Sequence, residues 1–128
     1  SYWDSGRFGM EQVMHGPRGT ARKVGDASVY RIAGKSGTAQ VVAIKQGEKY
    51  DRSKVQERHR DHALFVGFAP ADNPKIVVSV MVENGESGSG VAAPVVRQVM
   101  DAWLLDQDGR LKAEYASPIS AEATARDE

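Results

Sequence analysis

A short run in the first third of the chain places one cation, two hydroxyls and two glycines directly ahead of β-branched residues. The run covers residues 34–40 and reads G-K-S-G-T-A-Q, and Val41, Val42 and Ile44 follow it. Because β-branched residues favour strands, we predict that the run leads into or lies on a strand. Its side chains can hold a carboxylate while its backbone N–H groups face a reacting carbonyl. The run therefore indicates either a nucleotide loop or half of an acyl-transfer site.

The spacing of the run disfavours a nucleotide site. Residues 34–36 match the end of the phosphate-loop pattern G-x-x-x-x-G-K-[ST], whose first glycine would then fall at position 29. Val29 stands there instead. A phosphate loop must also open a helix, so that the helix N-terminus meets the anion, whereas the residues that follow here favour a strand.

The composition restricts the class of protein. The 128 residues, 13.9 kDa in all, are enough for one domain, and 17 basic residues balance 17 acidic ones. We therefore expect no nucleic acid partner, because a balanced charge provides no field to attract a polyanion. The chain has no cysteine, which excludes disulfides and thiolate metal sites. No apolar run approaches the roughly 20 residues that span a bilayer.

Hydrophobic periodicity and turn residues predict a mixed order of helices and strands. In chain order we expect a helix over 7–15, a strand over 29–33, a second strand or the continuation of the first over 38–44, a polar loop over 45–61, strands over 62–68 and 76–83, a flexible connection over 84–90, a helix from Pro94 to about Leu105, and a disordered tail over 106–128.

The strands over 62–68 and 76–83 are predicted to form an antiparallel hairpin, because only a short turn with two prolines separates them. The second strand is apolar at successive positions, which is typical of a strand buried on both faces of a sheet. We predict an α+β fold in which an antiparallel sheet is sandwiched by helices.

Three sequence blocks together resemble one enzyme family. They are G-K-S-G-T-A-Q at 34–40, H-A-L-F-V-G-F-A-P at 62–70 and G-V-A-A-P-V at 90–95. In this order they resemble the C-terminal part of the transpeptidase domain of class B penicillin-binding proteins, in particular the elongation-type members of Gram-negative bacteria. The resemblance covers about residues 6–105. It implies the transpeptidase fold shared with serine β-lactamases, of which residues 1–105 supply the C-terminal portion and 106–128 a tail.

The resemblance also implies that the catalytic nucleophile lies outside this chain. The family uses a serine and a lysine in S-x-x-K, a second motif S-x-N, and K-[ST]-G. Only the third motif is matched here, at Lys35-Ser36-Gly37. In the family both other motifs precede K-[ST]-G, so we expect them upstream of Ser1 and expect this chain alone to be inactive.

The family's roles carry over to four residues of the run. The resemblance implies that Lys35 supplies positive potential and orients the S-x-N serine. Ser36 and Thr38 would hydrogen-bond the terminal carboxylate of a stem peptide or a β-lactam, and the Thr38 N–H would be one of two oxyanion donors. Gly37 would allow the substrate backbone to approach closely.

The resemblance further implies partners and a location. The partners would be a peptidoglycan stem peptide ending in D-Ala-D-Ala, β-lactams, and a membrane glycan polymerase of the elongation machinery. The chain would belong to the periplasmic part of an inner-membrane-anchored protein, with the anchor outside this chain. No metal or other cofactor is expected. The loop over 45–61 would overhang the cleft or be a solvated loop of mixed charge.

Other functions remain open from the sequence. The chain could be a non-catalytic binding module that retains the pocket strand, or part of a serine β-lactamase or β-lactam sensor, which share K-[ST]-G. His59, Asp61 and His62 lie within four residues and are candidate metal ligands, but a loop-to-strand transition does not bring them together and no further ligand is evident. His15 is expected to be structural, at the end of the first helix.

Overall fold

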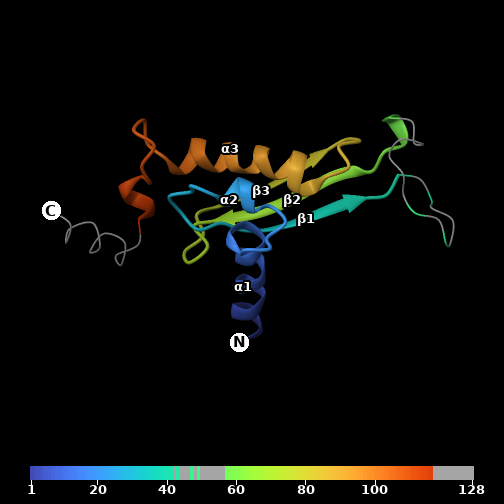
Figure 1. Ribbon diagram of the computed structural model, residues 1–128. Coiled ribbons are helices and arrows are strands. Elements are labelled where there is room, and N and C mark those ends of the chain that lie inside the picture. The colour runs from blue at the N-terminus through green and yellow to red at the C-terminus, as the bar shows by residue number, and fades with distance from the viewer. Residues whose placement is uncertain (42, 44–46, 48, 50–56, 117–128) are drawn as a thin grey trace.

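Three antiparallel strands in the order β1-β2-β3 form the sheet around which the chain is arranged (Figure 1). The computed structural model describes residues 1–41, 43, 47, 49 and 57–116. The elements are α1 (Tyr2–His15), α2 (Arg22–Gly25), β1 (Ala33–Ala39), β2 (His62–Ala69), β3 (Ile76–Val82) and α3 (Ala93–Leu104), with short turns η2 (Glu57–His59), η3 (Gly88–Ala92) and η4 (Ala113–Tyr115). Helix α3 lies along the sheet, and α1 projects away from it. The expected α+β architecture with an antiparallel sheet is confirmed.

The hairpin of β2 and β3 has the predicted bounds to within one residue. The strands pair antiparallel from Ala69 opposite Ile76 to Ala63 opposite Val82. Strand β1 pairs with the other side of β2, also antiparallel. Both β1 and β3 are therefore edge strands within the described part of the chain.

One face of the sheet packs on α3 and the other is open in the described residues. On β3, Val78 is buried, whereas Val77 and Met81 are 67% and 58% exposed on the opposite face. The expectation that this strand is buried on both faces is therefore wrong for this chain. The apolar residues at successive positions fit a strand with two covered faces, but the described residues cover only one.

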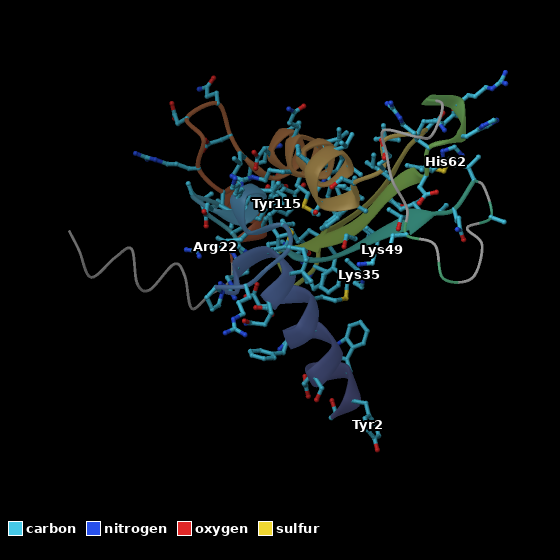
Figure 2. The ribbon with its side chains drawn as sticks, turned by 45° about the vertical axis from the view of Figure 1, so that its right-hand side comes forward. Tyr2, Arg22, Lys35, Lys49, His62 and Tyr115 are labelled. Atoms are coloured by element: carbon cyan, nitrogen blue, oxygen red, sulfur yellow. The ribbon has the colours of Figure 1, made fainter. Side chains whose placement is uncertain are left out.

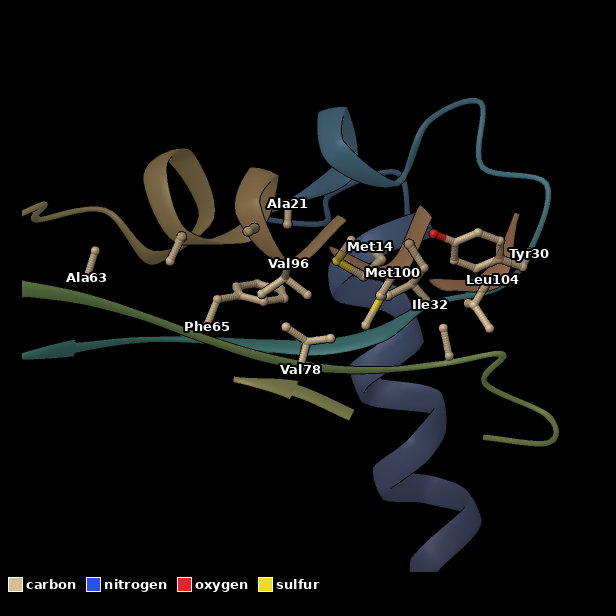
Figure 3. Packing of buried hydrophobic residues seen from close by; sticks show 13 residues of the cluster. Met14, Ala21, Tyr30, Ile32, Ala63, Phe65, Val78, Val96, Met100 and Leu104 are labelled. Atoms are coloured by element: carbon tan, nitrogen blue, oxygen red, sulfur yellow. The ribbon is translucent and has the colours of Figure 1, made fainter. Parts of the chain in front are cut away.

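The core lies between the sheet and α3 (Figure 3). The large side chains that are fully buried come from α1, from the residue before β1, from β2 and from α3, and are Met14, Ile32, Phe65, Val96, Met100 and Leu104. Gly34 belongs to this packing, because a Cβ there would lie 2.6 Å from the ring of Phe65. Within the described ranges, none of the helices combines the length and apolarity needed to cross a membrane.

Helix α1 begins five residues earlier than the sequence predicts. Ser1 caps the helix, since its hydroxyl accepts the Asp4 N–H and the Asp4 carboxylate accepts from the Ser1 amino group in return. This capping box satisfies N–H groups that the first turn leaves without helical partners. It stabilises the first turns of the helix even though Gly6 and Gly9 lower helix propensity.

The sequence left open whether residues 29–33 and 38–44 form two strands or one. The structure has one strand, β1, and its bounds of Ala33–Ala39 include the glycines. Residues 29–32 are not in a strand, because the Ile32 N–H donates to Nε2 of His15 at 2.9 Å instead of to a strand ladder. At the other end Gln40 and Val41 lie outside β1. Val42 and Ile44, and most of the polar loop expected over 45–61, lie outside the described residues.

A polar cluster fixes the segment that leads into β1 against α3. The Tyr30 hydroxyl donates to Oδ1 of Asp101 at 2.5 Å, and Nε of Arg97 donates to both oxygens of the same carboxylate at 2.9 and 3.0 Å. Nη1 of Arg97 also donates to the carbonyl of Val24 at 2.6 Å. Burial and the bond to Asp101 raise the pKa of the Tyr30 hydroxyl well above its ordinary value, so it stays a donor. The start of β1 is thus tied to α3 by hydrogen bonds to a charged group.

The segment after α3 has a defined course over residues 106–116. Leu105 forms a β-bridge with Leu111, and Leu111 and Tyr115 pack against the core. The structure therefore differs here from the disordered tail expected from residue 106. The segment is polar overall, but the side chains of Leu111 and Tyr115 anchor it to the core. Residues 117–128 lie outside the described residues, so the domain boundary at 105 stays a prediction.

We predict that acid destabilises this chain through His15. Burial, followed by the charge of Arg31, lowers the pKa of His15 below its ordinary value of 6.5, and its ring must stay neutral to accept the Ile32 N–H. Because the pKa of His15 is lower in the folded chain than in the unfolded chain, the unfolded chain binds more protons as the pH drops below about 6.5. The free energy of unfolding therefore decreases as the pH is lowered, until the pH is below the folded pKa as well. Thermal melts of the chain between pH 7.5 and 5 should show this loss.

The matched control is His15→Gln, which keeps an acceptor near the Ile32 N–H but does not titrate. Its melting temperature should fall less over the same pH interval. Equal pH dependence in both proteins would contradict the assignment.

Candidate active site

Strand β1 presents the hydroxyls of Ser36 and Thr38 on the same face. Residues directly opposite each other on paired strands share a face, and Ser36 lies opposite Phe65 while Thr38 lies opposite Ala63. Phe65 and Ala63 are buried against α3, so the two hydroxyls lie on the α3 side. Their spacing of two residues places two donors next to each other along the strand.

A hollow of about 470 Å³ lies beside β1, and we call it the β1 hollow. The residues that line it are mostly polar and come from β1, from the loop after β3, and from the turn before α2. They are Thr20, Lys35, Ser36, Gly37, Thr38, Glu86, Ser87, Gly88 and Ser89. Since β1 is an edge strand, the peptide groups along its free edge can pair with a bound peptide.

The second wall of the hollow, residues 86–89, touches β1 closely. A Cβ at Gly88 would lie 2.3 Å from the Leu64 carbonyl oxygen and 2.8 Å from that of Gly37. Only glycine allows this approach, because both neighbours are backbone atoms that cannot rotate away. By contrast, a Cβ at Gly37 would meet the Leu64 side chain at 3.5 Å, an ordinary contact. Among the residues that the structure describes, the packing therefore requires glycine at 88 and does not require it at 37.

Charge in the hollow comes from one lysine and one glutamate. Lys35 is exposed, and its Nζ donates to the carbonyl of Ser36 at 2.6 Å, which holds the ammonium along the strand (Figure 2). Glu86 forms an ion pair of 3.5 Å with Nε of Arg60, so its charge is balanced from outside the hollow. The cation of Lys35 and the nearby hydroxyls make the β1 side suitable for an anionic group.

The structure brings all four residues predicted for the site to one place. Lys35, Ser36, Gly37 and Thr38 all line the β1 hollow. Ser36 and Gly37 are partly buried, while Lys35 and Thr38 are exposed. Their individual roles stay predictions.

The sequence did not identify the opposite wall. The segment over 84–90 reads as a flexible connection rich in glycine, yet it supplies Glu86, Ser87 and Ser89 to the hollow. Thr20, also unrecognised, comes from the turn ahead of α2. The signal available was a cluster of hydroxyls among glycines directly after a strong strand, but nothing in the sequence shows which strand it packs on.

Two of the three histidines, His15 and His62, accept backbone hydrogen bonds and have structural roles. Nδ1 of His62 accepts the Asn84 N–H at 2.9 Å, and His15 accepts the Ile32 N–H. Across the part of the chain that the structure describes, no three His, Asp or Glu residues gather as metal ligands would.

The sequence matches a family model over residues 1–101. The family is described as "Penicillin binding protein transpeptidase domain". The peptidoglycan D,D-transpeptidase MrdA of Haemophilus influenzae is 47% identical over 102 residues, which are 80% of this chain and 16% of that protein. MrdA of Escherichia coli strain K12 is 42% identical over 122 residues, 94% of this chain and 19% of that protein. The chain thus spans less than a fifth of the length of these relatives.

Solved structures give the same result for the fold. Pseudomonas aeruginosa PBP2 in complex with WCK 5153 is 68% identical, with a TM-score of 0.75, over 91% of this chain and 22% of that chain. PBP2 of Helicobacter pylori, in a complex with MreC, is 31% identical, with a TM-score of 0.59, over 76% of this chain and 16% of that chain. The expected transpeptidase fold and the resemblance to elongation-type proteins are confirmed.

We predict that Gly88→Ala lowers the melting temperature of the chain, because the added methyl group must push two backbone segments apart. Overpacking of this kind costs about 1–3 kcal/mol. The control is Gly6→Ala on α1, where a Cβ would meet nothing within 4 Å. That change should be neutral or stabilising by up to about 1 kcal/mol, since alanine favours helix. Equal melting temperatures for Gly88→Ala and the unchanged chain would show that the close approach is not present in solution.

Proposed function

Since this chain belongs to the family of penicillin-binding protein transpeptidase domains, we propose that the β1 hollow is the carboxylate-binding part of a peptidoglycan D,D-transpeptidase site. The observation that carries the proposal is the pair of hydroxyls from Ser36 and Thr38 on one face of an edge strand, together with Lys35, which lines the same hollow. A carboxylate accepts several hydrogen bonds at once and is held best by donors of this kind around a positive charge.

The proposed ligand is the D-Ala-D-Ala end of a stem peptide, or a β-lactam that resembles it. In our assignment Ser36 and Thr38 donate to the terminal carboxylate, and Lys35 adds positive potential. The Thr38 N–H serves as one oxyanion donor, which contributes about 3 kcal/mol to the transition state in comparable sites. Gly37 keeps space for the ligand backbone, which fits the finding that no contact among the described residues requires glycine there.

The reaction proceeds in two steps on a serine that we place outside this chain. The serine oxygen attacks the carbonyl carbon of the penultimate D-Ala, and the peptide C–N bond breaks. The leaving D-Ala takes a proton, and an acyl ester remains on the serine. An acceptor amine then attacks the ester carbonyl, a new peptide bond forms, and the serine regains its proton. The β1 hollow binds and orients the donor peptide, and the nucleophile approaches from the rest of the domain.

The relatives suggest the setting of this activity. We propose that the intact protein is a periplasmic, membrane-anchored enzyme of cell-wall elongation that maintains cell shape and is a target of β-lactam antibiotics. Its partner would be a membrane glycan polymerase. PBP2 of H. pylori has been solved in a complex with MreC, which supports a further assembly partner in addition to the polymerase.

We predict that Ser36→Ala and Thr38→Ala weaken reaction with penicillin in the whole protein that carries this chain. Loss of one hydrogen bond to a charged group costs about 1.5–3 kcal/mol, which corresponds to a decrease of about 10- to 100-fold in the second-order acylation rate. The control is Ser79→Ala, because Ser79 lies on the open face of the sheet, away from the hollow. Unchanged acylation in the β1 variants would refute carboxylate binding by these hydroxyls.

The isolated 128-residue chain should not be labelled covalently by a fluorescent penicillin, because we place the nucleophile elsewhere. The measurement is a gel-based labelling assay with the whole protein as the positive control. Specific labelling of the isolated chain would mean that it contains the nucleophile, and would also reopen the β-lactamase and sensor alternatives. Absence of labelling in the whole protein would favour the non-catalytic binding module.

A further inference from the structure

A hydrogen-bonded cluster at one end of the β1 hollow ties both of its walls to the segment that precedes β2. We propose that Asp61 and Asn84 form a latch that sets the separation of these two walls, so that both are positioning residues for the ligand in the hollow. The identity of that ligand rests on the proposed function. Figure 2 shows the neighbouring His62 at the end of the sheet where β1 finishes.

Asp61 holds one wall with its side chain and the other with its backbone. Its Oδ1 accepts the N–H of Val41, two residues beyond the end of β1, at 3.3 Å. Its carbonyl oxygen accepts the N–H of Glu86, the first residue of the second wall, at 2.9 Å. One residue therefore connects the end of the first wall to the beginning of the second.

Asn84 fixes the same segment from the other side. Its side-chain amide donates to the carbonyl of Arg60 at 2.7 Å and to that of Arg58 at 3.2 Å. Its own N–H donates to Nδ1 of His62. The backbone of Asn84 has a φ of +53°, a left-handed conformation that asparagine adopts more readily than most residues. The side chain and the backbone of Asn84 thus both favour this arrangement.

An ion pair completes the connection to the hollow. Glu86 also has a left-handed φ, +62°, and pairs with Arg60 at 3.5 Å, with side chains that are 13% and 26% exposed. Glu86 lines the hollow, whereas Arg60 belongs to the segment held by Asn84. Movement of residues 58–62 would therefore move Glu86 and the wall that follows it.

The position of this wall determines the space for a ligand. The wall rests on the backbone of Gly37 and Leu64 at Gly88, and the latch holds its other end. With both ends fixed, Ser87 and Ser89 keep a set distance from the hydroxyls of β1. Donors held in place before binding need no reordering when the ligand arrives, which improves binding and reaction.

The test compares variants of the whole protein that carries this chain. Asn84→Asp keeps the size and the left-handed tendency of the side chain, but replaces the N–H donors that face two carbonyls with acceptors. Asp61→Ala removes the acceptor for Val41, and Asp61→Asn retains it. Asn73→Asp is the matched control, because Asn73 is exposed in the turn at the other end of the same hairpin. Asn84→Gly, which also accepts a positive φ, replaces Asn84→Asp if that variant does not fold.

Two measurements are made on each variant. Hydrogen–deuterium exchange without ligand reports opening at the amides of Val41 and Glu86. The second-order rate of acylation by a fluorescent penicillin reports the use of the hollow. We expect Asn84→Asp and Asp61→Ala to speed exchange at these amides and to slow acylation, each by about tenfold, as loss of one or two hydrogen bonds predicts. Asp61→Asn and Asn73→Asp should match the unchanged protein in both.

The outcomes separate the latch from the proposed function. Unchanged exchange at Val41 and Glu86 in Asn84→Asp and Asp61→Ala overturns the latch. Faster exchange with an acylation rate equal to that of Asn73→Asp overturns its positioning role. If the unchanged protein does not react with penicillin at all, the proposed function fails, and the exchange data alone then decide whether the latch joins the two walls.

Discussion

The close contact of two backbone segments at Gly88 and Gly37 is the constraint on which the candidate site depends. A Cβ at Gly88 would overlap the carbonyl oxygens of Leu64 and Gly37. The segment over 86–89 can therefore lie directly on β1 and enclose a narrow polar hollow. With any larger residue at 88 the wall would be displaced, and the hydroxyls on its two sides would no longer face the same small volume.

Strand β1 is held firmly at its two ends and left open between them. At its start, Tyr30 and Arg97 bind Asp101 on α3, and His15 binds the Ile32 N–H. At its end, Asp61 binds the Val41 N–H. The middle of the strand has an unpaired edge in the described residues, so its donors are free for a ligand while the strand itself is fixed. Such an arrangement lowers the entropic cost of binding, because little has to be ordered afterwards.

The open face of the sheet has a physical consequence for this chain. Val66, Val77 and Met81 are exposed on the face opposite α3. A contiguous apolar face of this kind normally contacts another element or another protein.

The elements with strong local patterns were predicted well. The hairpin of β2 and β3 and the helix α3 have bounds within one residue of those expected, because their apolar periods and their turn residues are unambiguous. The start of α1 was predicted too late, since a capping box outweighed two glycines. The strand over 29–33 was wrong, because its backbone bonds to His15 rather than to β2.

By itself the sequence determined the antiparallel α+β class, the family, and the grouping of Lys35, Ser36, Gly37 and Thr38 as candidate site residues, because these follow from local periodicity and from three blocks in a fixed order. Only the tertiary structure placed all four residues on strand β1 and decided what lies opposite that strand. Glu86, Ser87 and Ser89 belong to a segment that looks like a flexible linker, and its place is set by a long-range backbone contact and by hydrogen bonds to Asp61 and Asn84. Contacts between residues so far apart in the chain leave no periodic signal in the sequence, so spacing alone could not reveal them.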